Sequence, residues 1–320
     1  MTEYEIRQAI PEDLDQVIAL LRETMQRGDD ARFIELFRWK HLDNAFGLSP
    51  AWVALDGDRI IAARYFMRWE FERREVRYRA VRAVDTATHP DYQGKGLFRQ
   101  LTLGAIDDLT TNGVDFIFNT PNDQSRPGYL KMGWQLVGVL GVHGRPTSLR
   151  GVVKMATSRV AADHFSLDTT AGDPALVVLG DNDFIVQLLS ELEPSDQLRT
   201  PQSPDVLRWR FGSELLKYRV AVHRDGIGIF RIRQRGAARE LAITAILTSK
   251  GVGGTRAITQ AVLRCAKGQA DYAVCLGKKL MPSFFALPKV GPTLAWRALN
   301  DTVMTPLDGW SLTLGDIELF

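Results

Sequence analysis

Gln93, Gly94, Lys95 and Gly96 lie between a stretch typical of a β-strand and a stretch typical of a helix. Glycine has no Cβ atom, so the backbone can approach a ligand closely, and the free N–H groups at a helix start attract anions. The turn therefore predicts a site for a phosphorylated ligand. A P-loop does not fit, because Gly96 stands where a hydroxyl residue is required, and a dinucleotide fingerprint fits poorly, because Arg99 replaces its third glycine.

The turn resembles the acyl-CoA-binding motif of the GNAT acyltransferase superfamily, in which a strand, His-Pro and Q/R-x-x-G-x-G/A lead into a helix. Gln93 and Gly96 match its first two marked positions, whereas Phe98 replaces the usual glycine or alanine. Farther along, the family carries an asparagine, a small residue, a tyrosine and a Gly-aromatic pair at fixed spacings. The residues at those spacings are Asn122, Ser125, Tyr129, Gly133 and Trp134. The resemblance covers about residues 3 to 142, and the alternative is a left-handed glycine turn without a ligand.

The resemblance implies that acetyl-CoA is the co-substrate and that no metal is required. In the GNAT fold two neighbouring strands splay apart, and the free strand edge binds the pantetheine amides as an added strand would. We expect backbone groups of the strand end to bind pantetheine, N–H groups of the turn to bind the pyrophosphate, and Arg99 to add a charge-assisted contact. The expected CoA-binding residues are Thr86, Ala87, Thr88, Gln93, Gly94, Lys95, Gly96, Leu97, Phe98, Arg99, Asn122 and Ser125.

The resemblance also implies direct transfer of the acyl group to an amine. Tyr129 resembles the general acid of the family, which donates a proton to the CoA sulfur; the alternative is a structural tyrosine packed under CoA. Asp85 is the candidate base, acting directly or through water, and an ordinary hydrogen-bonding role is its alternative. The carboxylate of Phe320 is a further candidate, because two-domain relatives can use the chain end as a base. Asp316 and Glu318 lie where the related ending tends to carry two aspartates.

The order of elements favours an α/β (α+β) GNAT fold, with a mixed, mostly antiparallel sheet flanked by helices. We expect a strand over residues 4–10, a helix from Pro11, two strands around the turn at 56–58, and a strand ending near Thr88. A helix over 97–113 and a buried strand over 114–119 follow.

The second half looks like a degenerate copy of the first. Residues 36–44 resemble 206–214, with Trp39 matched to Trp209, and residues 96–118 resemble 254–276. The copy has Leu287 where the tyrosine would stand and lacks the glutamine or arginine of the turn. We therefore expect a catalytic acyl-CoA-binding domain over 1–150 and a degenerate GNAT-like domain over 151–320 that covers the acceptor cleft. Enhanced intracellular survival acetyltransferases and exopolysaccharide-associated GNAT proteins are similar two-domain members.

The amino-acid composition argues against several classes of partner and site. Forty Lys and Arg against 38 Asp and Glu leave a net charge of +2, so no overall field favours nucleic acid. Two cysteines, Cys265 and Cys275, exclude a disulfide framework and a four-cysteine zinc site. The start of the sequence does not resemble a signal peptide, and no run of 18 apolar residues occurs, so we expect a cytoplasmic protein without membrane insertion.

Together these features predict an acyl-CoA-dependent N-acyltransferase that acetylates an amine of a small molecule, sugar or peptide. One alternative is a non-catalytic acyl-CoA-binding regulator or scaffold. Another is an O-acyl or aminoacyl transferase that acts on a cell-envelope precursor. The acceptor, the preferred acyl chain and the oligomeric state do not follow from these residues.

Overall fold

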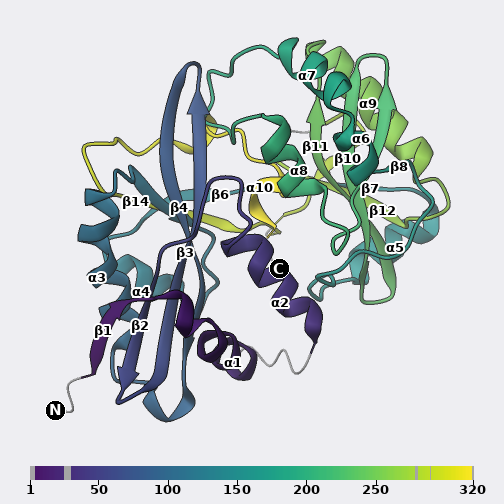
Figure 1. The fold of residues 1–320 in the computed structure, drawn as a ribbon. Helices are drawn as coiled ribbons and strands as arrows, with labels where there is room; N and C mark the ends of the chain where they lie inside the picture. The colour runs from purple at the N-terminus through teal and green to yellow at the C-terminus, as the bar shows by residue number, and fades with distance from the viewer. Residues whose placement is uncertain (1–3, 25–29, 278–279, 289, 319–320) are drawn as a thin grey trace. The chain divides into compact units, whose positions relative to one another are not determined.

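The chain divides into two compact units that are interleaved in sequence (Figure 1). A computed structural model describes residues 4–24, 30–277, 280–288 and 290–318. The first unit comprises the chain up to Phe71, Val76–Gly138 and Thr293–Pro306, and the second comprises Glu72–Glu75, Val139–Pro292 and the chain from Leu307 onward.

The first unit is built on a seven-stranded sheet with the order β1-β2-β3-β4-β5-β14-β6. Its pairs are antiparallel where registers are defined, except that β4 and β5 are parallel. The strands are β1 (Glu5–Gln8), β2 (Ala51–Asp56), β3 (Arg59–Arg73), β4 (Val76–Thr88), β5 (Phe116–Asn119), β6 (Gln135–Val139) and β14 (Thr293–Ala298). The helices are η1 (Pro11–Asp13), α1 (Leu14–Thr24), α2 (Ala31–His41), η2 (Pro90–Tyr92), α3 (Leu97–Thr111) and α4 (Arg126–Lys131).

Helix α3 packs on this sheet through one apolar stripe. Leu97, Leu101, Ala105 and Leu109 recur every four residues and are all buried, as expected for a helix with one face on a core. All four residues of β5 are also buried, so the predicted apolar strand is confirmed. This packing fixes the start of α3, and with it the glycine turn, against the end of β4.

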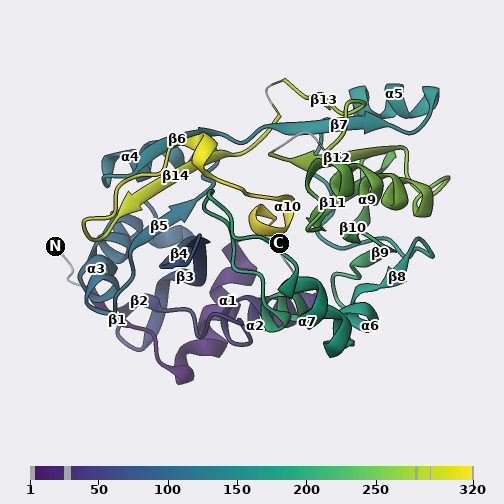
Figure 2. The ribbon, with the colours of Figure 1, turned by 90° about the horizontal axis from the view of Figure 1, so that it is seen from above.

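One strand of the first sheet comes from the far end of the chain. Strand β14 lies between β5 and β6, and Figure 2 shows it beside them. Its register with β5 pairs Ala295 with Asn119 and Ala298 with Phe116. In exchange, β7 (Val142–Pro146), which directly follows β6 in sequence, pairs with β12 of the second sheet. The exchange was not among the sequence-based expectations.

The second unit has its own seven-stranded sheet with the order β13-β7-β12-β11-β10-β9-β8. Its other strands are β8 (Asp173–Pro174), β9 (Arg219–His223), β10 (Gly226–Arg235), β11 (Ala238–Leu247), β12 (Tyr272–Leu276) and β13 (Phe285–Ala286). The helices are α5 (Leu149–Thr157), α6 (Ala175–Gly180), α7 (Asn182–Ser190), α8 (Pro204–Phe211), α9 (Gly251–Cys265), η3 (Leu307–Gly309) and α10 (Leu314–Ile317).

The two sheets repeat one plan. Strands β8, β9, β10, β11, β12, β7 and β13 follow the same spatial order as β1, β2, β3, β4, β5, β14 and β6. Helix α9 connects the parallel pair β11 and β12, as α3 connects β4 and β5. The fold is therefore α+β, with an N-terminal sheet domain followed by a second sheet domain, as the sequence predicts.

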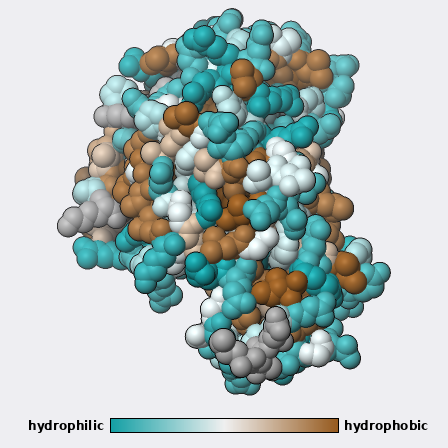
Figure 3. Space-filling model, turned by 90° about the vertical axis from the view of Figure 1, so that its left-hand side faces the viewer, coloured by the Kyte–Doolittle hydropathy of each residue, from teal (hydrophilic) through white to brown (hydrophobic). Residues whose placement is uncertain are grey.

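Hydrophilic residues cover much of the face seen in Figure 3, with hydrophobic residues in separate patches among them. Within the described ranges, no helix is long and apolar enough to cross a membrane. Those same ranges contain no group of three or more histidine, cysteine or acidic side chains placed to hold a metal ion. Cys265 and Cys275 are both free thiols.

Candidate functional site

Strands β4 and β5 pair over a short stretch and then separate. Their parallel register covers Ala80 to Arg82, opposite Phe116 to Phe118. Strand β4 then continues to Thr88 beyond this paired stretch. A strand edge without a neighbouring strand presents N–H and C=O groups that can bind an extended ligand. Thr86, Ala87 and Thr88 lie on this part of β4.

The glycine turn leaves the start of α3 open. Gly94 and Gly96 have φ angles of +75° and +78°, which residues with a Cβ rarely adopt. A Cβ built on Gly94 meets no atom within 4 Å. Gly96 is the N-cap of α3 and supplies no side-chain cap, so the first N–H groups of the helix remain available to an anion. The turn is thus open to an anion such as a phosphate group.

A groove of about 590 Å³ follows the strand end and the turn. Thr24 and Tyr92 contribute to its wall, and nine of the predicted CoA-binding residues line it. These nine are Thr86, Ala87, Thr88, Gln93, Gly94, Gly96, Leu97, Phe98 and Arg99. Most of the residues expected to bind CoA therefore line one groove.

The other three predicted CoA-binding residues do not line this groove. Lys95 points to the N-terminal strand, where its Nζ donates to the Tyr4 hydroxyl at 2.9 Å and lies 4.4 Å from the ring centre of Tyr92. Asn122 accepts hydrogen bonds from the N–H and the hydroxyl of Ser125, both at 2.9 Å. This pair orders the loop before α4, the helix that carries Tyr129.

Phe98, the departure from the motif, packs against Tyr129. Their rings meet edge to face with centroids 5.5 Å apart. A Cβ at Gly128 would lie 3.3 Å from Cε1 of Phe98, so the glycine in α4 makes room for the larger ring. The bulky residue is therefore accommodated on the α4 side and still lines the groove.

Tyr129 is held at its hydroxyl by a buried arginine. The side chain is 5% exposed and also packs against Trp134, with ring centroids 5.2 Å apart. Nη2 of Arg64 donates to the Tyr129 hydroxyl oxygen at 2.7 Å. The hydroxyl proton itself has no acceptor among the residues that the structure describes. The Tyr129 hydroxyl is therefore fixed in position by Arg64, and only the side chain of Phe98 separates the Tyr129 ring from the groove.

Arg64 lies at the centre of this arrangement and was not predicted from the sequence. Its Nη1 donates to the hydroxyl of Thr86 on β4, and its guanidinium carbon lies 5.4 Å from the ring centres of both Phe98 and Tyr129. The side chain is 1% exposed, and no ion pair joins it to a carboxylate within the described part of the chain. One signal was available, because Arg64 interrupts the apolar run from Ile60 to Met67.

Asp85 is engaged by two side chains of α2, the cation Lys40 and His41. Its Oδ2 lies 2.5 Å from Lys40 Nζ and 2.7 Å from His41 Nε2, and all three side chains are buried. Burial alone would raise the pKa of Asp85, but the charge of Lys40 and the hydrogen bond from His41 hold that pKa well below its usual value. A carboxylate held in this way is a weak base. These contacts favour the ordinary hydrogen-bonding role of Asp85, and they join β4 to α2 at a residue with a φ of +42°.

Burial lowers the pKa of His41, because its ring has no exposed surface. Its Nδ1 has no hydrogen-bond partner within the described ranges. A neutral ring that donates from Nε2 to Asp85 satisfies this geometry, whereas an imidazolium would leave a second buried N–H unpaired.

The predicted residues at the chain end anchor it to the second sheet. Asp316 accepts a hydrogen bond from Thr200 at 2.6 Å, and Glu318 lies 3.1 Å from Arg231 Nε and 2.8 Å from Arg233 Nη1. Phe320, whose carboxylate is a candidate base, lies outside the described residues.

A segment near the chain end lies at the place in the second sheet that corresponds to the split. Residues Trp310 to Thr313 lie together with residues of β11 and β12, around a cavity of about 260 Å³. Leu287, matched in sequence to the tyrosine position, contacts Gly144 of β7. The expectation that the second half has no CoA site of this kind stays a prediction.

Comparison with known proteins identifies the first domain. Residues 5–137 match the family model described as an acetyltransferase (GNAT) domain. This domain belongs to the GNAT family. Membership implies the use of acyl-CoA by this domain and acyl transfer as its class of reaction. No protein in the curated set matches the chain.

Solved structures match the GNAT domain together with the second sheet domain. A probable N-acyltransferase from Enterococcus faecalis V583 aligns over 93% of this chain and 73% of its own, with a TM-score of 0.66 at 15% identity. A GCN5-related N-acetyltransferase from Anabaena variabilis also aligns over 93% of this chain and 73% of its own, with a TM-score of 0.64 at 14% identity. Eis1 from Mycobacterium abscessus aligns over 93% of this chain and 74% of its own, with a TM-score of 0.59 at 12% identity. At these identities the matches show the shared two-domain fold.

Proposed function

We propose that the protein transfers an acyl group, acetyl in the first instance, from acyl-CoA to an amine of a small molecule, sugar or peptide. The observation that carries the proposal is the groove of about 590 Å³, which combines the free edge of β4 with the open start of α3. Tyr129 lies behind this groove in contact with Phe98, one of its lining residues.

Different residues of the groove bind different parts of acyl-CoA. The backbone of Thr86 to Thr88 binds the pantetheine amides, and the N–H groups from Gly94 to Phe98 bind the pyrophosphate with the help of the helix dipole. Arg99 is exposed at the groove and adds a positive charge. Bound acyl-CoA supplies the thioester whose carbonyl carbon the amine attacks.

Tyr129 is the proposed acid. Arg64 occupies the hydroxyl oxygen as a donor, so the tyrosine proton must point elsewhere and is available to a leaving thiolate. The guanidinium charge also lies next to the oxygen that would carry negative charge once the proton has left. Arg64 is therefore proposed as a positioning residue that fixes the orientation of Tyr129.

The amine must lose a proton during transfer, and Asp85 is poorly suited to accept it. Its carboxylate already holds Lys40 and His41, and its lowered pKa disfavours protonation. We propose instead that water in the groove, or the carboxylate of Phe320, accepts the proton. The role of the second domain in covering the acceptor stays a prediction.

The release of free CoA thiol from acetyl-CoA, measured across a panel of amines, sugars and peptides, tests the proposal. We expect release that depends on both acetyl-CoA and one class of amine. Calorimetry with acetyl-CoA runs beside it. Binding of acetyl-CoA with no release on any acceptor would favour the non-catalytic regulator, and absence of binding would overturn the assignment of the groove.

A further inference from the structure

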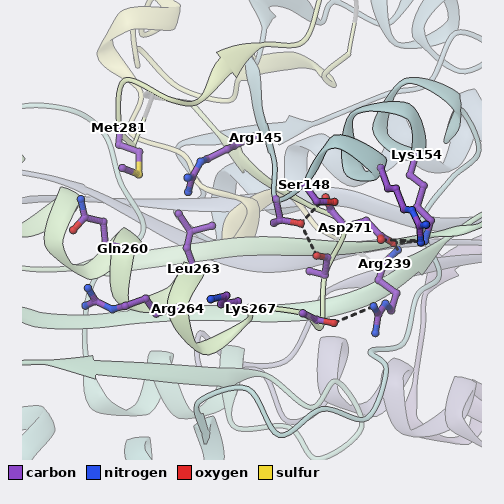
Figure 4. A pocket seen from close by; sticks show the side chains of 14 residues that line it. Arg145, Ser148, Lys154, Arg239, Gln260, Leu263, Arg264, Lys267, Asp271 and Met281 are labelled. Carbon is purple, nitrogen blue, oxygen red and sulfur yellow. Dashed lines mark hydrogen bonds and ion pairs between the residues drawn. The ribbon is translucent and has the colours of Figure 1, made fainter.

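A second large cavity, of about 860 Å³, lies in the second unit and shares no lining residue with the CoA groove. It is formed where the end of β7, the start of α5, the second half of α9, and the starts of β11 and β12 come together (Figure 4). The lining residues are Arg145, Thr147, Ser148, Arg150, Lys154, Arg239, Gln260, Leu263, Arg264, Lys267, Gly268, Ala270, Asp271 and Met281. We call this cavity the basic pocket.

The basic pocket carries a charge that the rest of the chain does not share. Six of its lining residues are Arg or Lys, and one is acidic. The whole chain has 40 basic and 38 acidic residues; without those of the pocket it has 34 and 37, a net charge of −3. The residues of this cavity therefore account for the net positive charge of the chain.

Most of these cations lack a carboxylate partner. Lys154 is paired with Asp271, at 3.0 Å and 2.9 Å to its two oxygens. Arg239 donates to the backbone oxygen of Gly268 at 3.1 Å, a neutral acceptor. Within the described part of the chain, no ion pair joins a carboxylate to Arg239 or to the four other pocket cations, Arg145, Arg150, Arg264 and Lys267. Arg239 and Lys154 both attract Asp271 electrostatically, and the other four cations line the cavity without an ion pair to a carboxylate of the described residues.

The cations also come from different sides of the cavity. Figure 4 shows Arg264 on α9, Lys267 just after that helix, Arg145 on the β7 side, and Arg239 and Lys154 at the other end. Like charges that line one cavity repel each other, and an anion bound among them lowers that repulsion.

The walls between the cations are apolar or neutral. Leu263, Ala270 and Met281 line the cavity together with Gln260. A volume of about 860 Å³ lies within the range of about 300 to 1,000 Å³ that small-molecule sites occupy. The pocket thus suits a compact ligand with several negative charges and a flat or apolar part.

We propose that the basic pocket binds a phosphorylated small molecule of this kind, a nucleoside diphosphate being the ligand that fits best. The phosphates neutralise the cations of α9 and β7, and the base packs against Leu263 and Met281. This site does not depend on the proposed acyl transfer, because all its residues belong to the second unit.

Calorimetry of the full chain with ADP, at about 0.15 M salt and without magnesium, tests the site. Pyrophosphate and adenosine are measured separately, and ADP is expected to bind more tightly than either. The variant Gly96→Glu, which blocks the phosphate turn of the CoA groove, should still bind ADP. Loss of ADP binding in Gly96→Glu would show that ADP had occupied the CoA groove and would overturn the proposal.

Two charge reversals on α9 provide the matched comparison. Arg264→Glu changes a pocket residue, whereas Arg256→Glu changes an exposed arginine of the same helix that does not line the pocket. We expect Arg264→Glu to weaken ADP binding at least tenfold and Arg256→Glu less than twofold. Equal weakening by both variants would indicate general charge attraction and refute the site. Displacement of ADP by a short single-stranded oligonucleotide at much lower concentration would identify nucleic acid as the ligand instead.

Discussion

Replacing Tyr129 by phenylalanine tests the proposed acid directly. The ring contacts with Phe98 and Trp134 are retained, and only the hydroxyl is lost. Loss of a general acid lowers kcat by about 10² to 10⁴, with little change in acetyl-CoA affinity. The variant also leaves Nη2 of the buried Arg64 without its acceptor, which costs about 1 to 3 kcal/mol of stability. Steady-state kinetics on the best acceptor and chemical denaturation measure the two effects separately.

Thr86→Val is the matched control for this experiment. It removes the other hydrogen-bond acceptor of Arg64 and leaves the Tyr129 hydroxyl in place. We expect a similar loss of stability but a decrease in kcat of less than tenfold. If Tyr129→Phe retained more than about a third of the wild-type kcat, less than about 0.7 kcal/mol of the barrier would depend on the hydroxyl. Tyr129 would then be a structural residue, and Arg64 would have no acid to position.

Three further predictions concern the turn, the α2 contact and the chain end. Acetyl-CoA should bind with one equivalent per chain by calorimetry, and Gly96→Glu should weaken it more than tenfold by placing a carboxylate against the pyrophosphate. Burial lowers the pKa of His41 in the folded state, so the unfolded state takes up the proton first as the pH decreases. At pH values under about 6.5, the free energy of unfolding should therefore decrease by up to about 1.4 kcal/mol per pH unit. The difference in unfolding free energy between wild type and His41→Gln should show this slope; an unchanged difference between pH 7.5 and 5 would contradict it. Glu318→Ala removes one member of a buried ion pair with Arg231 and should destabilise the second unit by about 3 to 5 kcal/mol in denaturant, whereas a loss below 1 kcal/mol would show that this contact does not anchor the chain end.

The turn and its groove could be predicted from the sequence because they are local. The glycine conformation, the helix start and the end of β4 all fall within residues 86 to 99. Nine predicted residues of this stretch line the groove. Lys95 could not be assigned in this way, because its direction depends on Tyr4, which lies far away in sequence.

The contacts that decide the roles of Tyr129 and Asp85 are long-range. Arg64 is 65 positions from Tyr129, and Lys40 is 45 positions from Asp85. No spacing rule connects such residues, because sheet order and helix packing bring them together. The exchange of β7 and β14 escaped prediction for the same reason, since short apolar strands give no indication of which sheet they join.

The repeated plan of the two sheets explains why only one of them is proposed to bind acyl-CoA. Each sheet contains a parallel pair joined by a helix, and this arrangement opens where the two strands stop pairing. In the first sheet the edge of β4 beyond the pairing faces a groove. In the second, the segment from Trp310 to Thr313 lies against β11 and β12, and the ion pairs of Glu318 fix the chain just after it. A ligand there would have to displace buried side chains such as Trp310 and Leu312, each of which contributes about 1.5 to 3 kcal/mol by burial. The chain end thus lies where the second copy would bind a cofactor, and acyl transfer by the first copy stays a proposal.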